Sequence, residues 1–234
     1  MKTVAIIPTG GSGRRMGGSI AKQYLPLAGI PLLVHTLSTF QKSSVIDDIF
    51  LIIPEGDFLY VRQMIIEKYG LSKVSRILTG GRQRQDSVKN GLDVVGTEHS
   101  IIVIHDGVRP FISEEMLHRI VIEALQAKAV TFGIPAKDTV KTIGASGWVR
   151  ETLNRDGLCL TQTPQAFERQ IIKKAYQTAG EDHFYGTDDA SLVERIGIKV
   201  KMIPGSYDNI KITTRDDLVL GEFLIGRQKE ISRG

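Results

Sequence analysis

The chain has 234 residues, a length that allows one large α/β domain with an ample hydrophobic core. Apolar residues make up 41% and charged residues 24% of it, which is ordinary for a globular protein. The net charge of +4 is too small to indicate a nucleic-acid partner by itself, and no apolar run approaches the ~20 residues that a membrane helix needs. Basic residues gather near glycines, which favours a small polyanionic ligand.

The cysteines and histidines limit which disulfides and metal sites the chain can form. Cys159 is the single cysteine, so no intrachain disulfide can form, and a reducing cytoplasm is the expected location. The chain enters a strand almost at once, with no signal-peptide pattern. We expect Cys159 to be a small buried apolar residue. The five histidines show no metal-ligand spacing, so we expect no protein-bound zinc.

Apolar runs bounded by turn residues predict six buried strands. Several of these runs lead directly into glycine-rich or charged loops. The predicted strands are Val4–Pro8, Asp48–Pro54, Val74–Leu78, Ile101–His105, Val130–Ile134 and Lys199–Ile203.

Segments with helical spacing lie between these strands. Ser113 followed by Glu114 and Glu115, and Thr214 followed by Asp217, are typical of helix starts. The alternation predicts an α/β fold, with a mostly parallel sheet and right-handed crossovers. Ligands of such sheets bind beyond the carboxyl ends of the strands. The predicted helices are Pro31–Phe40, Phe58–Lys68, Ser87–Val95, one after Ser113, Glu168–Ala179, Asp188–Arg195 and one from about Arg215.

The pattern changes between Lys137 and Arg155. Two polar–apolar alternating segments flank the turn Gly144–Gly147, which predicts an inserted β-hairpin. An isolated hairpin is marginally stable, so this one needs a partner surface, either on a second chain or on its own domain. The lone Trp148 favours a second chain. We therefore predict one domain over residues 1–234, with a dimerisation arm over residues 137–155 and a homodimer as the assembly.

The loop after the first strand is rich in glycine. Gly10, Gly11 and Gly13 let the backbone approach a ligand closely, and successive N–H groups in such a turn form an anion-binding nest. Arg15 and Lys22 add positive charge. The sequence therefore predicts a polyphosphate site at this loop.

Two familiar phosphate motifs do not match this loop. A P-loop requires Lys followed by Ser or Thr, whereas Lys22 is followed by Gln23. The dinucleotide fingerprint requires Gly or Ala where Met16 stands. The simplest alternative, a plain turn with solvated basic residues, is disfavoured because cations recur at other strand ends.

Other loops carry charged residues. Asp106 could hold a metal or a sugar hydroxyl and Arg109 a phosphate, or the two could merely order a turn. His105 is expected to be structural. Lys211, in a predicted short alternating strand, could hold a phosphate or be a solvated edge lysine. Thr187 could be only a helix N-cap.

Seven motifs follow one another along the chain: Pro8–Met16 with Lys22–Tyr24, Gly80–Val88, His105–Phe111, Lys137–Lys141, Thr161–Gln165, Gly186–Ser191 and Asp208–Lys211. Together they resemble those of the 2-C-methyl-D-erythritol 4-phosphate cytidylyltransferase family. The resemblance covers nearly the whole chain. It implies a Rossmann-like, nucleotidyltransferase-type fold and a reaction of CTP with 2-C-methyl-D-erythritol 4-phosphate that gives 4-diphosphocytidyl-2-C-methyl-D-erythritol and pyrophosphate, in non-mevalonate isoprenoid synthesis.

The resemblance also implies roles for individual residues. Arg15 and Lys22 would stabilise charge on the α-phosphate, and Lys211, with Arg155 from a second subunit, would complete the catalytic set. It implies Mg²⁺, held mainly by the CTP phosphates. The implied nucleotide-binding residues are Pro8, Thr9, Gly10, Gly11, Gly13, Gly81, Ser87, Asp106 and Gly107. The implied sugar-phosphate residues are Asp106, Arg109, Thr139, Arg155, Thr163, Thr187 and Lys211.

Three alternatives remain open from the sequence. A ribitol 5-phosphate cytidylyltransferase shares the glycine loop and the motif from Asp106 to Pro110, although Lys137–Lys141 and Gly186–Ser191 look closer to the methylerythritol enzymes. The glycine loop alone also allows a nicotinamide-dependent reductase or a non-catalytic nucleotide-binding protein.

Overall fold

The computed structural model describes residues 2–9 and 21–231. Their central feature is a seven-stranded sheet in the order β11-β7-β10-β6-β1-β4-β5, in which β10 runs antiparallel to its neighbours and the other six strands are parallel to one another. The predicted mostly parallel sheet is therefore confirmed. The strands are β1 (Lys2–Pro8), β4 (Asp48–Ile53), β5 (Val74–Thr79), β6 (His99–Ile104), β7 (Ala129–Pro135), β10 (Cys159–Glu168) and β11 (Lys201–Pro204).

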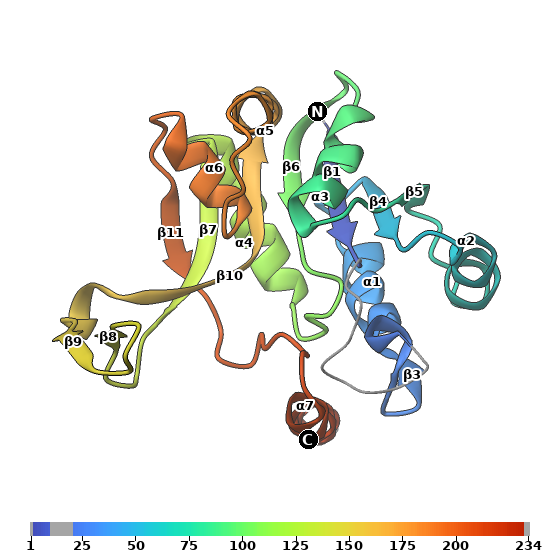
Figure 1. The fold of residues 1–234 in the computed structure, drawn as a ribbon. Helices are drawn as coiled ribbons and strands as arrows, with labels where there is room; N and C mark the ends of the chain where they lie inside the picture. Colours follow the sequence, from blue (N-terminus) through green and yellow to red (C-terminus); the bar gives the residue numbers. More distant parts are fainter. Residues whose placement is uncertain (1, 10–20, 232–234) are drawn as a thin grey trace.

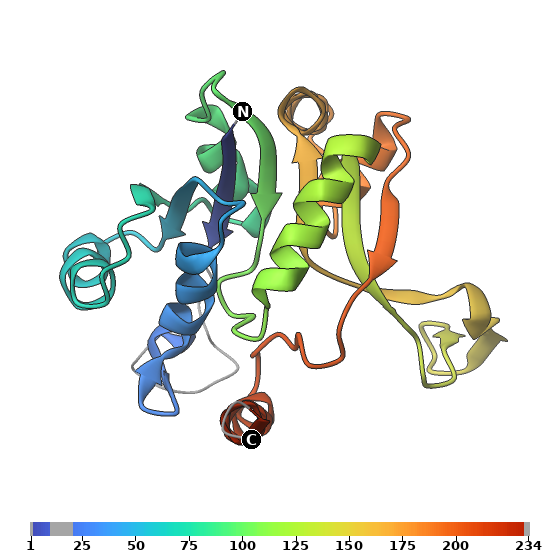
Figure 2. The same ribbon diagram turned by 180° about the vertical axis from the view of Figure 1, so that it is seen from behind.

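Helices cover both faces of this sheet. In Figure 1, α3, α5 and α6 lie in front of it, whereas Figure 2 shows α1 and α4 on the opposite face. The expected helix over residues 58–68 begins as α2 and continues as the π-helical segment η3. The helices are α1 (Leu32–Lys42), α2 (Phe58–Tyr60), η3 (Val61–Glu67), α3 (Arg84–Asp93), α4 (Glu114–Ala127), α5 (Arg169–Glu181), α6 (Asp189–Arg195) and α7 (Arg215–Ile231).

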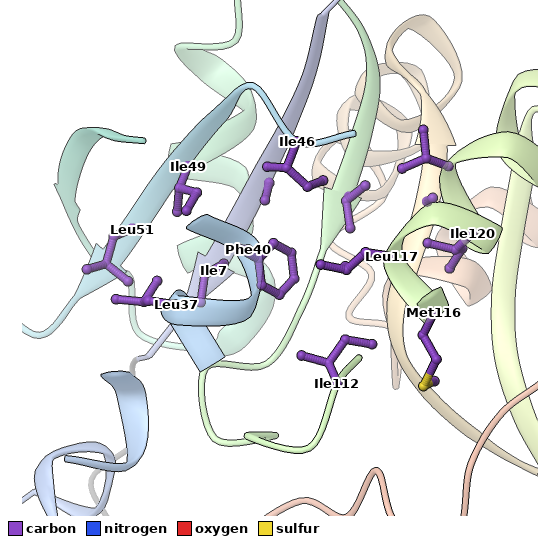
Figure 3. Close-up of a cluster of buried hydrophobic side chains, with 14 of the residues drawn as sticks. Ile7, Leu37, Phe40, Ile46, Ile49, Leu51, Ile112, Met116, Leu117 and Ile120 are labelled. Carbon is purple, nitrogen blue, oxygen red and sulfur yellow. The ribbon is translucent and has the colours of Figure 1, made fainter. Parts of the chain in front are cut away.

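Apolar side chains fill the space between the sheet and each helical layer. Behind the sheet, Leu37 and Phe40 of α1 meet Leu117 and Ile120 of α4 over the strands (Figure 3). On the other face of the sheet, a second cluster of buried apolar side chains includes Val88 of α3. Burial on both faces explains why the strand sequences read as continuous apolar runs.

Strand β10 is absent from the sequence prediction. Its sequence contains Pro164, which lacks an N–H group and argues against a central strand. The structure resolves the conflict with a register shift between Gln162 and Gln165, so Pro164 lies where the ladder with β7 is interrupted. The prediction that Cys159 is buried is wrong: this residue begins β10 and is exposed, because its end of the strand extends toward the arm.

The predicted hairpin exists and projects from the body of the molecule (Figures 1 and 2). It consists of β8 (Lys141–Ile143) and β9 (Val149–Thr152), followed by a 3-10 turn, η4 (Arg155–Gly157). Trp148 is 78% exposed, and Ile143 and Val149 are also exposed. The possibility that the hairpin lies on its own domain is therefore wrong, since its apolar side chains remain uncovered within this chain.

The C-terminal part of the chain is held beneath the carboxyl ends of the strands. Side chains of α7 pack with Leu27 of the short ribbon β2 (Pro26–Leu27) and β3 (Ile30–Pro31), and with Ile212. The Ile212 N–H donates to the Val108 carbonyl at 2.9 Å. This bond brings the segment before α7 against the loop that follows β6. The segment is not the short strand that was predicted around Lys211; it has no strand pairing.

The predicted N-terminal capping residues of the helices are confirmed at two helices and differ at one. Ser113 accepts a hydrogen bond from the Met116 N–H, and Asp217 closes the predicted capping box with Thr214. At α6 the cap is Asp188, which accepts from the Ser191 N–H, and not Thr187. Thr187 therefore precedes the helix and lines a cavity. Among the described helices, none is long and apolar enough to cross a membrane.

Candidate active site

A cavity of about 240 Å³ opens beyond the carboxyl ends of β6 and beside β10. Five residues that the sequence analysis assigned to sugar-phosphate binding line it, although they come from four separate segments of the chain. The complete lining is Arg84, Asp106, Arg109, Thr161, Gln162, Thr163, Gln165, Thr187, Asp188 and Lys211.

Asp106 is surrounded by positive charge. Its Oδ1 accepts a hydrogen bond from Arg84 Nε at 2.8 Å, and its Oδ2 lies 2.9 Å from Lys211 Nζ. Arg109 Nε lies 3.6 Å from the same Oδ2. The side chain of Asp106 is only 9% exposed, so these cations, rather than water, provide its surroundings.

The cations determine the ionisation of Asp106. Burial by itself would raise the pKa of this carboxyl, but the charge of Arg84, followed by Lys211 and Arg109, outweighs burial and holds the pKa well below its usual range. Asp106 is therefore a carboxylate at neutral pH. It cannot serve as a proton donor, and its role is to hold and orient cations and hydroxyl groups.

Arg84 lines the cavity and lies in a motif that the sequence analysis quoted, but it was assigned no role there. It begins α3, and its Nη1 and Nη2 donate to the two oxygens of Asp189 at 3.1 and 2.8 Å. Asp189 is almost completely buried and also accepts from the Tyr176 hydroxyl. Arg84 therefore joins three helices, α3, α5 and α6, to the loop after β6.

A second set of hydrogen bonds fixes the loop that carries Thr163. The Thr163 hydroxyl accepts a hydrogen bond from the Asp106 N–H at 3.1 Å. The backbone carbonyl of Thr163 accepts one from the Asn209 side chain at 2.9 Å. The Asn209 carbonyl in turn accepts from Arg109 Nη1 at 2.8 Å. The interrupted register of β10 presents Thr163 to this network, as bulges near sites often do.

Those residues predicted to bind the nucleotide that the structure describes lie at the same edge of the sheet. Pro8 ends β1, and the Gly107 N–H donates to its carbonyl at 3.1 Å. A Cβ at Gly107 would lie 2.7 Å from Thr9 Cγ2, so only glycine allows these two strand ends to approach so closely. The Thr9 hydroxyl donates to the Ile52 carbonyl.

Gly81 and Ser87 form the neighbouring turn after β5. The Gly81 N–H donates to Ser87 Oγ at 3.1 Å, and that hydroxyl donates to the Gln83 carbonyl. A Cβ at Gly81 would lie 2.3 Å from the Asp86 Cβ, which explains the glycine. Ser87 is thus committed to shaping this loop.

The remaining predicted residues fall either outside the described part of the chain or away from the cavity lining. Gly10, Gly11, Gly13 and Arg15 lie outside the described residues. Lys22 begins the short 3-10 helix η2 (Lys22–Tyr24) and is half-buried.

Thr139 and Arg155 are exposed at the base of the arm, where Arg155 Nη1 donates to the Lys137 carbonyl. Neither lines the cavity of its own chain. Their predicted contact with substrate therefore requires the arm of another subunit.

His105 is structural, as expected. It is fully buried, its Nε2 is 3.1 Å from the Arg109 carbonyl, and burial lowers its pKa to about 4. The imidazole is therefore neutral at pH 7. Within residues 2–9 and 21–231, the structure contains no group of three His, Cys, Asp or Glu side chains that could hold a metal.

The fold and the site define a class. A mostly parallel sheet covered by helices on both faces, with a cation-rich cavity beyond its strand ends, is an α/β architecture of the nucleotidyltransferase type. Residues 3–227 match the family model IspD, 2-C-methyl-D-erythritol 4-phosphate cytidylyltransferase. The chain belongs to this family.

Individual relatives agree with that assignment. The 2-C-methyl-D-erythritol 4-phosphate cytidylyltransferase of Syntrophus aciditrophicus is 51% identical over 97% of each chain, and that of Geobacter metallireducens is 46% identical over 96% of this chain and 98% of its own. The crystal structure of 4-diphosphocytidyl-2C-methyl-D-erythritol synthase from Anaerococcus prevotii superposes with a TM-score of 0.85 at 35% identity, over 96% of both chains.

Proposed function

We propose that this chain transfers the cytidylyl group of CTP to 2-C-methyl-D-erythritol 4-phosphate, releasing pyrophosphate. Its family membership and the cation-lined cavity support this reaction. An oxygen of the sugar phosphate attacks the α-phosphorus of CTP, the bond to the β-phosphate breaks, and pyrophosphate leaves.

The attacking phosphate oxygen is already anionic, so this reaction needs no general base. Catalysis reduces to holding the two phosphates in line and neutralising the negative charge. The described cavity fits that requirement, since Arg109 and Lys211 face it and the neutral His105 is buried away from it. We assign Arg15 and Lys22 to the α-phosphate of CTP.

We infer that the sugar phosphate binds on the β6–β10 side of the sheet edge. Lys211 would contact its phosphate, and Thr163, Thr187 and Asp106 would contact its hydroxyl groups. The nucleotide would then bind along Pro8, Thr9 and the turn with Gly81 and Ser87, at the ends of β1 and β5. The two sites meet at Asp106 and Gly107, where the sheet order changes direction between β1 and β6.

We further propose that the protein works as a single-domain homodimer in the cytoplasm. The uncovered apolar side chains of the arm support a partner chain, which would receive Arg155 and Thr139 at its cavity. We assign Mg²⁺ to the CTP phosphates, because the described carboxylates at the cavity are engaged: Asp106 by three cations, and Asp188 by the cap of α6. The ion would add to the charge neutralisation there.

Pyrophosphate release tests the function. The purified protein is mixed with CTP, Mg²⁺ and one of several polyol phosphates. We expect release with 2-C-methyl-D-erythritol 4-phosphate and much less with ribitol 5-phosphate. Faster release with ribitol 5-phosphate would move the assignment to the related enzyme, and no release with any polyol phosphate would contradict it.

A further inference from the structure

We propose that Arg84 is a positioning residue: it is the fixed counter-ion of Asp106, and so leaves Lys211 able to exchange Asp106 for the phosphate of the substrate. This inference rests on the proposed function, because it assigns the substrate phosphate to Lys211. It concerns a residue at the start of α3, the helix that follows β5.

The two cations that are within hydrogen-bond distance of Asp106 differ in how firmly they are held. The guanidinium of Arg84 donates three hydrogen bonds, two of them to the buried Asp189, and cannot leave without exposing that carboxylate to an apolar interior. Lys211 is 38% exposed and carries a compact ammonium on a flexible stem. Lys211 is therefore the cation that can move.

Each of these two cations has its own oxygen on Asp106. Arg84 uses Oδ1 and Lys211 uses Oδ2, so the departure of Lys211 does not disturb the Arg84 bond. Arg109 remains 3.6 Å from Oδ2 but forms no hydrogen bond through its Nε with any described residue. Arg84 thus provides the hydrogen-bonded charge that Asp106 keeps while Lys211 contacts substrate.

Without Arg84, Asp106 would compete with the substrate phosphate for Lys211. The expected effect is a rise in the KM for 2-C-methyl-D-erythritol 4-phosphate on the order of tenfold, the scale of one hydrogen bond between charged groups. The KM for CTP should rise less. A residue that only stabilised the fold would not separate the two KM values in this way.

The test replaces the whole buried pair, because Arg84→Gln alone would leave Asp189 uncompensated. The double variant R84Q/D189N substitutes two amides for the two charges. R84K keeps one positive charge and should show a smaller rise in KM. R195Q is the matched control: Arg195 lies on α6, as Asp189 does, and the substitution breaks its exposed pair with Asp182 and should leave both KM values unchanged.

The decisive measurement is whether the effect of R84Q/D189N on the KM for the sugar phosphate depends on Lys211. When R84Q/D189N is added to Lys211→Ala, the KM for the sugar phosphate should rise by less than about twofold, since no lysine remains to be released. An equal rise with and without Lys211 would overturn the inference, as would equal rises in the two KM values. If the wild-type protein released no pyrophosphate, the proposed function itself would fail. Wild-type activity with no effect of R84Q/D189N would refute only the role of Arg84.

Discussion

Removing the carboxylate of Asp106 should destabilise the protein measurably, although the residue lies at the candidate active site. The variant Asp106→Asn keeps the size of the side chain and removes its charge. Breaking a buried ion pair by removing one partner costs about 3 to 5 kcal/mol, because the other charge remains buried. The surroundings of Asp106 place the loss within that range.

The three cations around Asp106 would respond differently. Arg84 keeps Asp189, and Lys211 can turn to water because it is 38% exposed. Arg109, 13% exposed, is the one that would stay buried without a carboxylate. The loss should therefore be near the lower limit, about 3 kcal/mol. For a chain of this length that corresponds to a fall in melting temperature of roughly 6 to 12 °C.

The loss should also depend on pH in a defined direction. The folded-state pKa of Asp106 lies below its unfolded value of about 4, so the charged carboxylate stabilises the fold above that pH. As pH falls below about 4, toward the folded-state pKa, this contribution is lost. The difference in stability between wild type and Asp106→Asn should be constant from about pH 6 to 8 and narrow below about pH 4.

Urea denaturation of both proteins over this pH range measures the effect. The matched control is Asp182→Asn, which breaks the exposed pair with Arg195 and should cost less than about 1 kcal/mol. If Asp106→Asn were no less stable than Asp182→Asn at pH 7, Asp106 would not be held by the three cations in the way described.

Three further predictions concern catalysis. Arg15→Ala and Lys22→Ala should each lower kcat by roughly 10²-fold or more, with little change in the KM for the sugar phosphate, because they act on charge that develops in the transition state; near-normal kcat in steady-state assays would contradict this. Lys211→Ala should chiefly raise the KM for the sugar phosphate and leave CTP affinity, measured by calorimetry, within a few-fold; the reverse result would move Lys211 to the nucleotide side. Co-refolding equal amounts of Lys22→Ala and Arg155→Ala chains should restore about a quarter of wild-type activity, since half of the dimers are mixed and one of their two sites is intact; no recovery, or a monomer by sedimentation, would exclude the shared site.

Local pattern was enough to predict most of the framework. Six strands and the helices between them follow from apolar runs, helical spacing and caps such as Ser113, because each of these signals depends on a few neighbouring residues. The polar loops at the strand ends could also be placed, since parallel strands bring their carboxyl ends to one edge of the sheet. The position of the candidate cavity follows from that rule.

Two features were missed or misjudged where neighbours along the chain do not decide the outcome. Strand β10 was not predicted; it forms because it pairs with β6 and β7 on either side, with Pro164 at an interruption of the ladder. Cys159 was expected to be buried because of its residue type, but its exposure depends on the direction in which β10 leaves the sheet toward the arm.

The charge arrangement of the site was decided only by the tertiary structure. Arg84 and Asp189 are 105 residues apart, and nothing in their local sequence shows that they pair. The family resemblance placed Asp106, Arg109 and Lys211 in one site, but the sequence could not show that Lys211 pairs with the carboxylate of Asp106. The sequence thus determined which residue types stand at the strand ends. Their partners were decided by sheet order and helix packing, because hydrogen bonds between charged groups act over only a few ångströms.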